Sequence, residues 1–175
     1  MVDEPDRRGE IANSIEEVVR VLNTVAPAPA TVKAALDLLA ELAQFDNIEG
    51  VKQANNDNLA PVDGLSIYAG NDEILAAVLD MGEPGGILTA SHIVGAEMRR
   101  MVDEPAERAA IHNSLLPVFE ALSVAPAAVS NKAALNLLGH PVGAPRLPYV
   151  EADEHETATI RAMLTERGLL VGATA

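Results

Sequence analysis

The chain contains no cysteine among its 175 residues, which excludes disulfide bonds and thiolate metal sites. It is also poor in cations, with 12 lysines and arginines against 26 aspartates and glutamates and a formal net charge of −14. Because so acidic a chain repels phosphate groups, neither nucleic acid nor an anionic membrane is an expected partner.

Aromatic residues make up only 2% of the chain, so its core is expected to consist mainly of alanine, leucine, valine and isoleucine. No apolar run is long enough to cross a bilayer, and the opening residues MVDEPDRRGE do not form a signal peptide. We therefore expect a cytoplasmic protein. The length suffices for one domain with a core of its own.

An internal repeat is the clearest pattern in the chain. The segment MVDEP occurs at residue 1 and again at residue 101, and an Asn-Ser pair and a run KAAL follow both copies. Each copy predicts two helices, the first with an apolar face beginning at Ile11 or Ile111 and an N-cap at Asp3 or Asp103. A Val-Ala-Pro step ends that helix in both copies. The repeat indicates either an old tandem duplication or, as we favour, a truncated or designed chain.

The hydrophobic pattern changes between the two copies. Three short segments predict strands, at residues 48–52, 65–69 and 85–89. Helices are predicted over residues 72–81, 96–102 and 151–168, the last ending at Gly168, with a loop rich in proline and glycine over 140–148. Strands that alternate with helices favour βαβ units and a parallel sheet.

Residues 50–55 (GVKQAN) resemble the strand that carries the Schiff-base lysine in the superfamily of dihydrodipicolinate synthase and N-acetylneuraminate lyase. Residues 68–73 (YAGNDE) are similar to the next strand end of that family, and Gly85-Gly86-Ile87 to its last barrel strand. Its C-terminal helical domain is matched by residues 111–122, 132–139, 146–148 and 167–170. The resemblance is collinear from about Phe45 to Leu170.

The resemblance implies a mechanism without a cofactor, in which Lys52 attacks the ketone of pyruvate and the resulting imine activates carbon 3 toward an aldehyde. The pKa of the lysine must then fall toward neutrality, which burial at a strand end can achieve. In the family, backbone groups at the positions of Gly70 and Ile87 flank the pyruvate. In the lyase branch, the acidic positions of Asp72 and Glu73 contact the sugar chain.

The chain departs from the family pattern in its first half. The Gly-x-x-Gly-Glu type motif that binds the pyruvate carboxylate has no counterpart, and neither has the Tyr-Asn-x-Pro type strand end with its proton-relay tyrosine and the arginine after it. The two tyrosines of the chain, Tyr68 and Tyr149, have different surroundings in the sequence. Losing such groups costs orders of magnitude in rate.

Several residues have a simpler interpretation. Asp72 and Glu73 suit the first turn of a helix, where negative charge is favourable. Lys33 and Lys132 are expected to be solvated helix residues, and Asn55-Asn56-Asp57-Asn58 a polar turn rather than a calcium loop. The four histidines lack ligand spacing, so no metal site is expected.

Together these patterns predict an α/β protein, a partial TIM-type (βα) barrel of about three parallel strands with helices around it. We divide it into an N-terminal helical pair (1–44, the repeat of 101–139), a partial barrel with the Schiff-base lysine (45–100) and a C-terminal helical region (101–175). The exposed edges of so small a parallel sheet favour a homo-oligomer, or a cap from the first repeat.

The expected function is that of a pyruvate-dependent class I aldolase or lyase of the dihydrodipicolinate synthase type, acting on pyruvate and an aldehyde. Two alternatives remain, a non-catalytic, shortened or designed scaffold derived from that family and an aldolase of the N-acetylneuraminate lyase type. The missing first-half motifs favour the scaffold, and the intact strand around Lys52 favours the enzyme.

Overall fold

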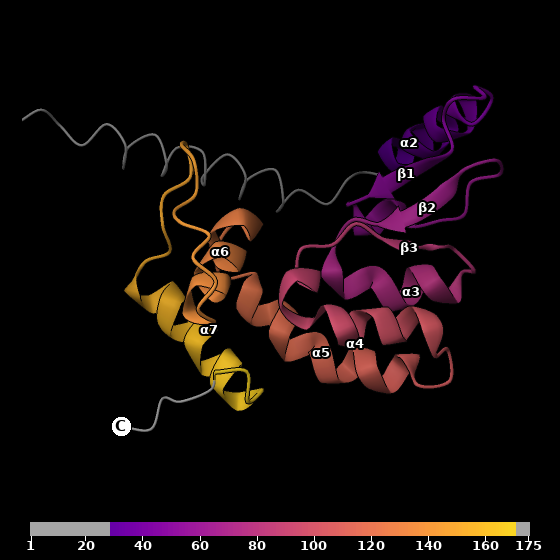
Figure 1. Cartoon of the computed structure of the whole chain (residues 1–175). Coiled ribbons are helices and arrows are strands. Elements are labelled where there is room, and N and C mark those ends of the chain that lie inside the picture. The colour runs from indigo at the N-terminus through magenta and orange to yellow at the C-terminus, as the bar shows by residue number, and fades with distance from the viewer. Residues whose placement is uncertain (1–28, 171–175) are drawn as a thin grey trace, which may run out of the picture.

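The structure, a computed structural model, describes residues 29–170 (Figure 1). The elements follow in the order α2 (Pro29–Leu42), β1 (Gly50–Gln53), η1 (Asn56–Asn58), β2 (Ser66–Ala69), η2 (Asp72–Ile74), α3 (Leu75–Asp80), β3 (Gly85–Gly86), α4 (Ser91–Asp103), α5 (Arg108–Leu122), α6 (Ala127–Leu137) and α7 (Glu154–Glu166). Strands alternate with helices up to β3, and only helices follow.

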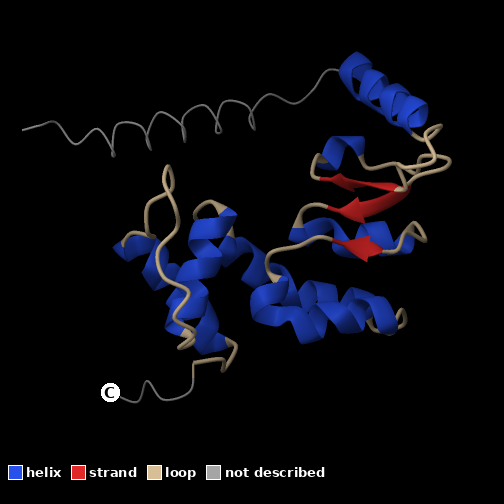
Figure 2. Ribbon diagram, turned by 45° about the horizontal axis from the view of Figure 1, so that its top comes forward, coloured by secondary structure: helices blue, strands red, loops and turns tan. Residues whose placement is uncertain are grey.

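The three strands form one parallel sheet in the order β1-β2-β3, which confirms the predicted parallel sheet (Figure 2). β1 and β2 pair over four residues, from Gly50 opposite Ser66 to Gln53 opposite Ala69. β3 is much shorter than predicted. Ahead of it, the carboxylate of Glu83 accepts a hydrogen bond of 2.7 Å from the N–H of Ile67, which satisfies a backbone donor of β2.

α2 packs on the sheet through a small apolar cluster. Its Leu36 and Leu39 lie against the buried side chains of Val62, Leu65 and Ile67, and the helix runs beside β1 in Figures 1 and 2. The helix predicted to follow an N-cap at Asp3, and with it most of the first repeat copy, lies outside the described residues. The N-terminal unit 1–44 therefore stays a prediction.

The helix predicted over residues 72–81 is present as the 3-10 turn η2 followed by α3. The apolar face expected from the sequence is buried there, with Ile74, Leu75, Val78 and Leu79 each less than a tenth exposed. These side chains join the larger core that the later helices build.

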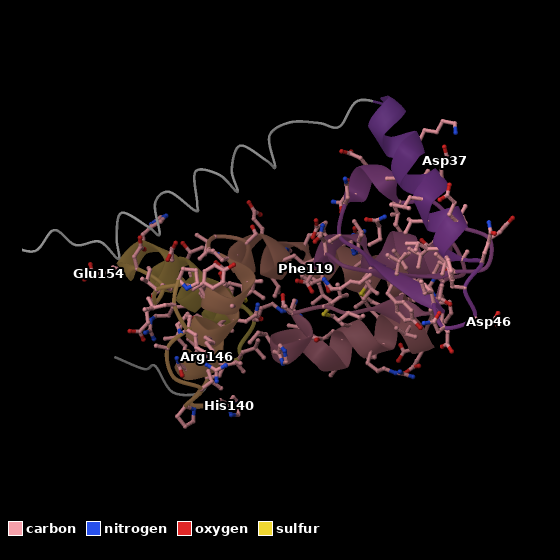
Figure 3. The ribbon with its side chains drawn as sticks, turned by 90° about the horizontal axis from the view of Figure 1, so that it is seen from above. Asp37, Asp46, Phe119, His140, Arg146 and Glu154 are labelled. Atoms are coloured by element: carbon pink, nitrogen blue, oxygen red, sulfur yellow. The ribbon has the colours of Figure 1, made fainter. Side chains whose placement is uncertain are left out.

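Helices α4 to α7 contact one another and supply most of the larger core. Its most completely buried large side chains include Met101, Leu115, Ile160 and Leu164. Phe119 is the one buried aromatic side chain among the described residues, in agreement with the predicted aliphatic core (Figure 3). A C-terminal unit with the boundaries 101–175 stays a prediction.

The helix start expected at Asp103 is wrong. Asp103 is the last residue of α4, where its carboxylate accepts two hydrogen bonds from Arg99 one turn earlier. Pro105 restricts the backbone of Glu104 and lacks an N–H, so the chain turns there. α5 begins only at Arg108, whose guanidinium donates to the carbonyl oxygen of Met101 (3.0 Å) and to the carboxylate of Asp80 (2.6 Å).

The loop over residues 140–148 is fastened to α6. The Nζ of Lys132 donates to the carbonyl oxygens of Val142 (3.1 Å) and Ala144 (2.9 Å). The side chain of Asn136 also donates to the carbonyl oxygen of Gly143 and accepts from the N–H of Val142. Lys132 is half-buried, and its hydrogen bonds to this loop were not predicted, whereas Lys33 is exposed as predicted.

The terminal helix has clear start and stop signals. Asp153 and Glu156 form a reciprocal capping box at the start of α7. Gly168, with φ of 67°, follows its end and confirms the predicted stop. Within residues 29–170, none of the helices has both the length and the apolar character that a membrane span needs.

Candidate active site

The residues singled out from the sequence meet where the three strands end. Lys52 is the penultimate residue of β1, Gly70 follows β2 and Ile87 follows β3. Since the strands are parallel, their carboxyl ends lie on the same side of the sheet. The Nζ of Lys52 donates to the carbonyl oxygen of Gly70 (3.1 Å), and the N–H of Ile87 donates to the carbonyl oxygen of Ala69 (2.9 Å).

Gly70 is required by the close approach of two strand ends. Its N–H donates to the carbonyl oxygen of Gln53 (2.7 Å), and a Cβ on Gly70 would lie 2.5 Å from that same oxygen. The resemblance gives only the backbone of this position a role, which calls for no side chain there. The geometry gives a stronger reason, because no side chain fits there.

Lys52 lies on the face of the sheet that also carries Gly50, Ser66 and Tyr68, since paired residues of a parallel sheet point to the same side. The ring of Tyr68 lies so close to Gly50 that a Cβ there would be 3.0 Å from its Cε2. Lys52 itself is exposed. The burial expected at this strand end is therefore absent among the described residues.

Asp72 joins the segment after β2 to the segment after β3. Its carboxylate accepts hydrogen bonds from the N–H of Ala90 (3.1 Å) and from the hydroxyl of Thr89 (3.4 Å). Burial raises the pKa of Asp72 above its ordinary value, and these hydrogen bonds and the nearby charge of Glu73 are smaller influences. Both Asp72 and Glu73 lie in the first turn of η2, which confirms the helix interpretation.

A second polar group joins β1 to the same 3-10 turn. The side-chain amide of Asn71 donates to the carbonyl oxygen of Ala54 (2.9 Å) and to Oδ1 of Asn56 (3.0 Å). Asn56 in turn donates to the carboxylate of Glu73 (3.2 Å). The sequence reasoning missed Asn71 and Thr89. The available signal was that Asn71 follows the predicted strand 65–69 and that Thr89 ends the predicted strand 85–89.

The expected polar turn over residues 55–58 is confirmed. Asn55 caps η1 by accepting a hydrogen bond from the N–H of Asp57 (3.0 Å). Between residues 29 and 170, histidine and acidic side chains nowhere gather in a group of three or more that could hold a metal ion. Tyr149 is exposed in the loop after α6 and has no part in the strand-end site.

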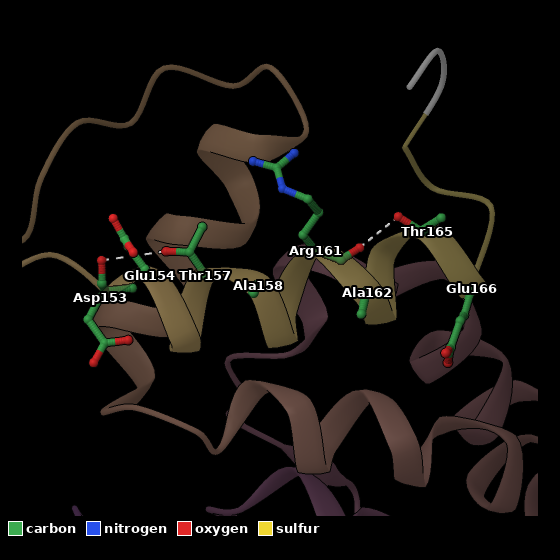
Figure 4. Close-up of a pocket in the computed structure, with 9 residues that line it drawn as sticks. Asp153, Glu154, Thr157, Ala158, Arg161, Ala162, Thr165 and Glu166 are labelled. Atoms are coloured by element: carbon green, nitrogen blue, oxygen red, sulfur yellow. Dashed lines mark hydrogen bonds between the residues drawn. The ribbon is translucent and has the colours of Figure 1, made fainter. Parts of the chain in front are cut away.

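A hollow in the described chain lies away from the strand ends. It holds about 650 Å³ and follows one side of α7, where Ala158, Arg161 and Ala162 line it (Figure 4). Thr165 lies on the same side, and its hydroxyl donates a hydrogen bond to the carbonyl oxygen of Arg161 (2.8 Å). Its lining holds no lysine, so this hollow offers no group for the imine chemistry that the resemblance implies.

Comparisons with known proteins point to one family. The profile described as the dihydrodipicolinate synthetase family matches residues 11–167. The 4-hydroxy-tetrahydrodipicolinate synthase of Heliobacterium modesticaldum is 38% identical over 153 residues, covering 81% of this chain and 49% of that protein. The corresponding enzyme of Oceanobacillus iheyensis is 32% identical over 169 residues, covering 89% and 56%. The chain thus spans about half the length of the curated relatives it matches.

Solved structures give the same result. Dihydrodipicolinate synthase from Thermotoga maritima has a TM-score of 0.71 at 28% identity, covering 77% of this chain and 51% of that one. A monomeric variant of dihydrodipicolinate synthase has a TM-score of 0.70 at 28% identity, covering 77% and 50%. Since one neighbour is monomeric, the homo-oligomer expected here stays a prediction.

Proposed function

The chain belongs to the dihydrodipicolinate synthetase family, and we propose that its strand-end site forms an imine between Lys52 and pyruvate. The reaction type is that of a lyase of the dihydrodipicolinate synthase kind, with an aldehyde as the second substrate. Lys52 is the nucleophile, and the backbone at Gly70 and Ile87 flanks the bound keto acid. No cofactor takes part, and a cytoplasmic location is proposed with it.

One observation carries the proposal, namely the position of Lys52 at the carboxyl ends of the parallel strands, in contact with the residue that follows β2. Its Nζ is 3.1 Å from the carbonyl oxygen of Gly70, which in turn follows the strand that β3 pairs with. The carboxyl edge of parallel strands is where enzymes with this barrel architecture hold their reacting groups. Lys33 and Lys132, the other lysines of the chain, lie on helices.

The first step, formation of the imine, involves the amine of Lys52 and the ketone of pyruvate. The neutral amine attacks the ketone carbon, and the carbonyl oxygen leaves as water once two protons have reached it, so that a carbon–nitrogen double bond forms. Loss of a proton from carbon 3 then gives an enamine, which attacks the carbonyl carbon of the aldehyde. The relay tyrosine and carboxylate motif of the family have no counterpart in the sequence, so slow turnover is part of the proposal.

The contacts of Asp72 favour the synthase type over the N-acetylneuraminate lyase type. The lyase type calls for Asp72 and Glu73 to contact a sugar chain. Both carboxylate oxygens of Asp72, however, already accept hydrogen bonds, from Ala90 and Thr89. Glu73 is exposed and accepts one hydrogen bond from Asn56. A role for the two acids in substrate binding stays a prediction.

Borohydride trapping tests the proposal. The protein is incubated with pyruvate, reduced, and analysed by intact mass and peptide mapping. Because the chain has only three lysines, the position of an adduct is unambiguous. We expect one reduced pyruvate adduct on Lys52.

Two variants serve as controls. Lys52→Ala should abolish the adduct and Lys33→Ala, at an exposed helix position, should leave it unchanged. Circular dichroism checks that each variant is folded. An absent adduct in the folded wild-type protein, or equal labelling of Lys33, would refute the imine and favour the non-catalytic scaffold.

A further inference from the structure

The segments that follow β1 and β2 are joined by two consecutive residues on each side. The N–H of Gly70 donates to the carbonyl oxygen of Gln53 (2.7 Å), and the side-chain amide of Asn71 donates to the next carbonyl oxygen, that of Ala54 (2.9 Å). The last backbone pair of the ladder is Gln53 opposite Ala69. The side chain of Asn71 therefore extends the pairing of the two strands by one further step.

The orientation of the Asn71 amide is fixed by its neighbours. The carbonyl oxygen of Ala54 can only accept, so the group that faces it is the NH2 of Asn71. The same nitrogen donates to Oδ1 of Asn56 (3.0 Å), and Asn56 donates in turn to the carboxylate of Glu73 (3.2 Å). With an acceptor at each end, one orientation of both amides satisfies all three hydrogen bonds, and both hydrogens of the Asn71 NH2 are used.

The peptide between Gly70 and Asn71 carries the oxygen that Lys52 contacts, because the carbonyl group of Gly70 accepts a hydrogen bond from Nζ of Lys52 (3.1 Å). Glycine restricts its own backbone angles less than any other residue does. This peptide is held on one side by the N–H of Gly70 and on the other by the side chain of Asn71. Loss of the Asn71 amide leaves one of these two anchors, and the carbonyl oxygen is then free to turn away from Lys52.

We propose that Asn71 is a positioning residue for the imine chemistry, which it serves by holding the Gly70 carbonyl oxygen toward the amine of Lys52. Lys52 is exposed, and a long exposed side chain samples many conformations unless its end is fixed. A nucleophile held in one orientation attacks faster than one that is not. The inference rests on the proposed function and adds the group that orients its nucleophile. Asn71 acts through Gly70 and is not itself a reacting group.

The chain offers a matched arrangement at a second lysine. On α6, the side chain of Asn136 donates to the carbonyl oxygen of Gly143 and accepts from the N–H of Val142. Lys132 donates to the carbonyl oxygens of Val142 and Ala144 in the same loop. Here too an asparagine fastens a segment whose carbonyl oxygens hold a lysine amine, but at a place outside the strand-end site. Asn136 is therefore the control position.

The first measurement uses the full chain and needs no pyruvate. Lysine labelled with 15N at Nζ gives one side-chain NMR signal for each of the three lysines, and the exchange of the Nζ hydrogens with water reports the hydrogen bonds of each. Asn71→Ala should accelerate exchange at Lys52 at least about threefold, the loss expected for one hydrogen bond, and leave Lys132 unchanged. Asn136→Ala should do the reverse. Circular dichroism checks that each variant is folded.

The second measurement is the rate at which cyanoborohydride traps the adduct on Lys52 over a series of pyruvate concentrations. Asn71→Ala should lower the limiting rate about tenfold, because the amine is no longer held in place. It should change the half-saturating pyruvate concentration by less than about twofold, since the N–H of Gly70 still fixes the strand end. Asn136→Ala should change neither value. Asn71→Asp keeps the size of the side chain but has no N–H to donate, and it should behave like Asn71→Ala.

Each contrary result has its own meaning. Unchanged exchange at Lys52 in both Asn71 variants would overturn the inference, with or without an adduct. A changed exchange with an unchanged limiting rate would make Asn71 a purely structural residue. A slower rate in Asn71→Asp alone would assign the effect to the added charge and contradict the role of the donor. No adduct in the folded wild-type protein would refute the proposed function, and the positioning role with it, whereas an adduct that both Asn71 variants form at the wild-type rate would refute the inference alone.

Discussion

The sheet region (29–90) and the helical region (91–170) differ in how much of the buried core they supply. Helices α4 to α7 supply most of the larger core, with Leu115, Ile160 and Leu164 0% exposed. The cluster between α2 and the sheet has only three buried members, Val62, Leu65 and Ile67. The stability of the chain should therefore reside mainly in its helices, while the candidate chemistry belongs to the region with the weaker core.

The largest effect is expected from a cavity in the helical core. Leu115→Ala should lower the free energy of unfolding by about 3–4 kcal/mol, because it removes buried contacts and leaves a void. Leu38→Ala, at an exposed position of α2, should change it by less than about 0.5 kcal/mol. Urea unfolding followed by circular dichroism measures both. Similar losses in the two variants would mean that the regions do not differ as their burial indicates.

A smaller loss is expected where the two regions are joined. The Arg108 side chain is only 12% exposed and connects Met101 in α4 to Asp80 at the end of α3. Arg108→Met should cost about 2 kcal/mol, since it breaks a charged hydrogen bond and frees a backbone acceptor.

Arg100→Met is the matched control for that variant. Arg100 pairs with Glu104 one turn away on the exposed side of α4, where such pairs contribute little. Urea unfolding should show little or no change for it. If Arg100→Met lowered the free energy of unfolding as much as Arg108→Met, the contacts of Arg108 would contribute no more to stability than an exposed ion pair.

Gly70, at the carboxyl end of β2, allows a test that links stability to the candidate chemistry. Gly70→Ala should cost about 1–3 kcal/mol, because its Cβ would collide with the carbonyl oxygen of Gln53 and separate the ends of β1 and β2. It should also reduce borohydride trapping at Lys52. Gly95→Ala, in α4 with open space around its Cβ, should be neutral or slightly stabilising. Equal urea midpoints for the two variants would show that the close approach at Gly70 relaxes without cost.

Local patterns in the sequence were enough to predict much of the fold. The alternating residues around Lys52 and Ile67 gave the first two strands, and the apolar spacing from Ile111 gave α5. The stop at Gly168 followed from the usual end of a helix. Each of these depends on residues close together in the chain. The alternation of strands and helices then predicted the parallel sheet, and the resemblance to a known family predicted that Lys52 and Gly70 share one site.

Features that depend on distant residues could not be predicted. Lys132 has the sequence surroundings of a solvated helix residue, and only the folded loop brings the carbonyl oxygens of Val142 and Ala144 to it. The exposure of Lys52 likewise follows from the absence of a covering layer within residues 29–170, which a strand pattern does not predict. The partners of Asp72 lie after a different strand, at Thr89 and Ala90.

The last expected effect is a pH dependence that distinguishes burial from hydrogen bonding at Asp72. Burial raises its pKa in the folded state above 3.8, the ordinary value. The native state then binds the proton more tightly than the unfolded state. The stability contributed by this group is therefore present below about pH 3.8 and is lost as the pH rises through the folded pKa. Asp72→Asn removes the charge and keeps an acceptor for the N–H of Ala90.

Urea unfolding over a series of pH values should thus show the wild-type protein losing stability relative to Asp72→Asn as the pH increases. Asp63→Asn, at an exposed position, controls for the change in net charge and should run parallel to the wild type. If wild type instead gained stability over Asp72→Asn with rising pH, the hydrogen bonds from Ala90 and Thr89 would outweigh burial. The carboxylate would then hold the segments after β2 and β3 together through its charge, and Asp72 would be a stabilising part of the sheet region rather than a strained one.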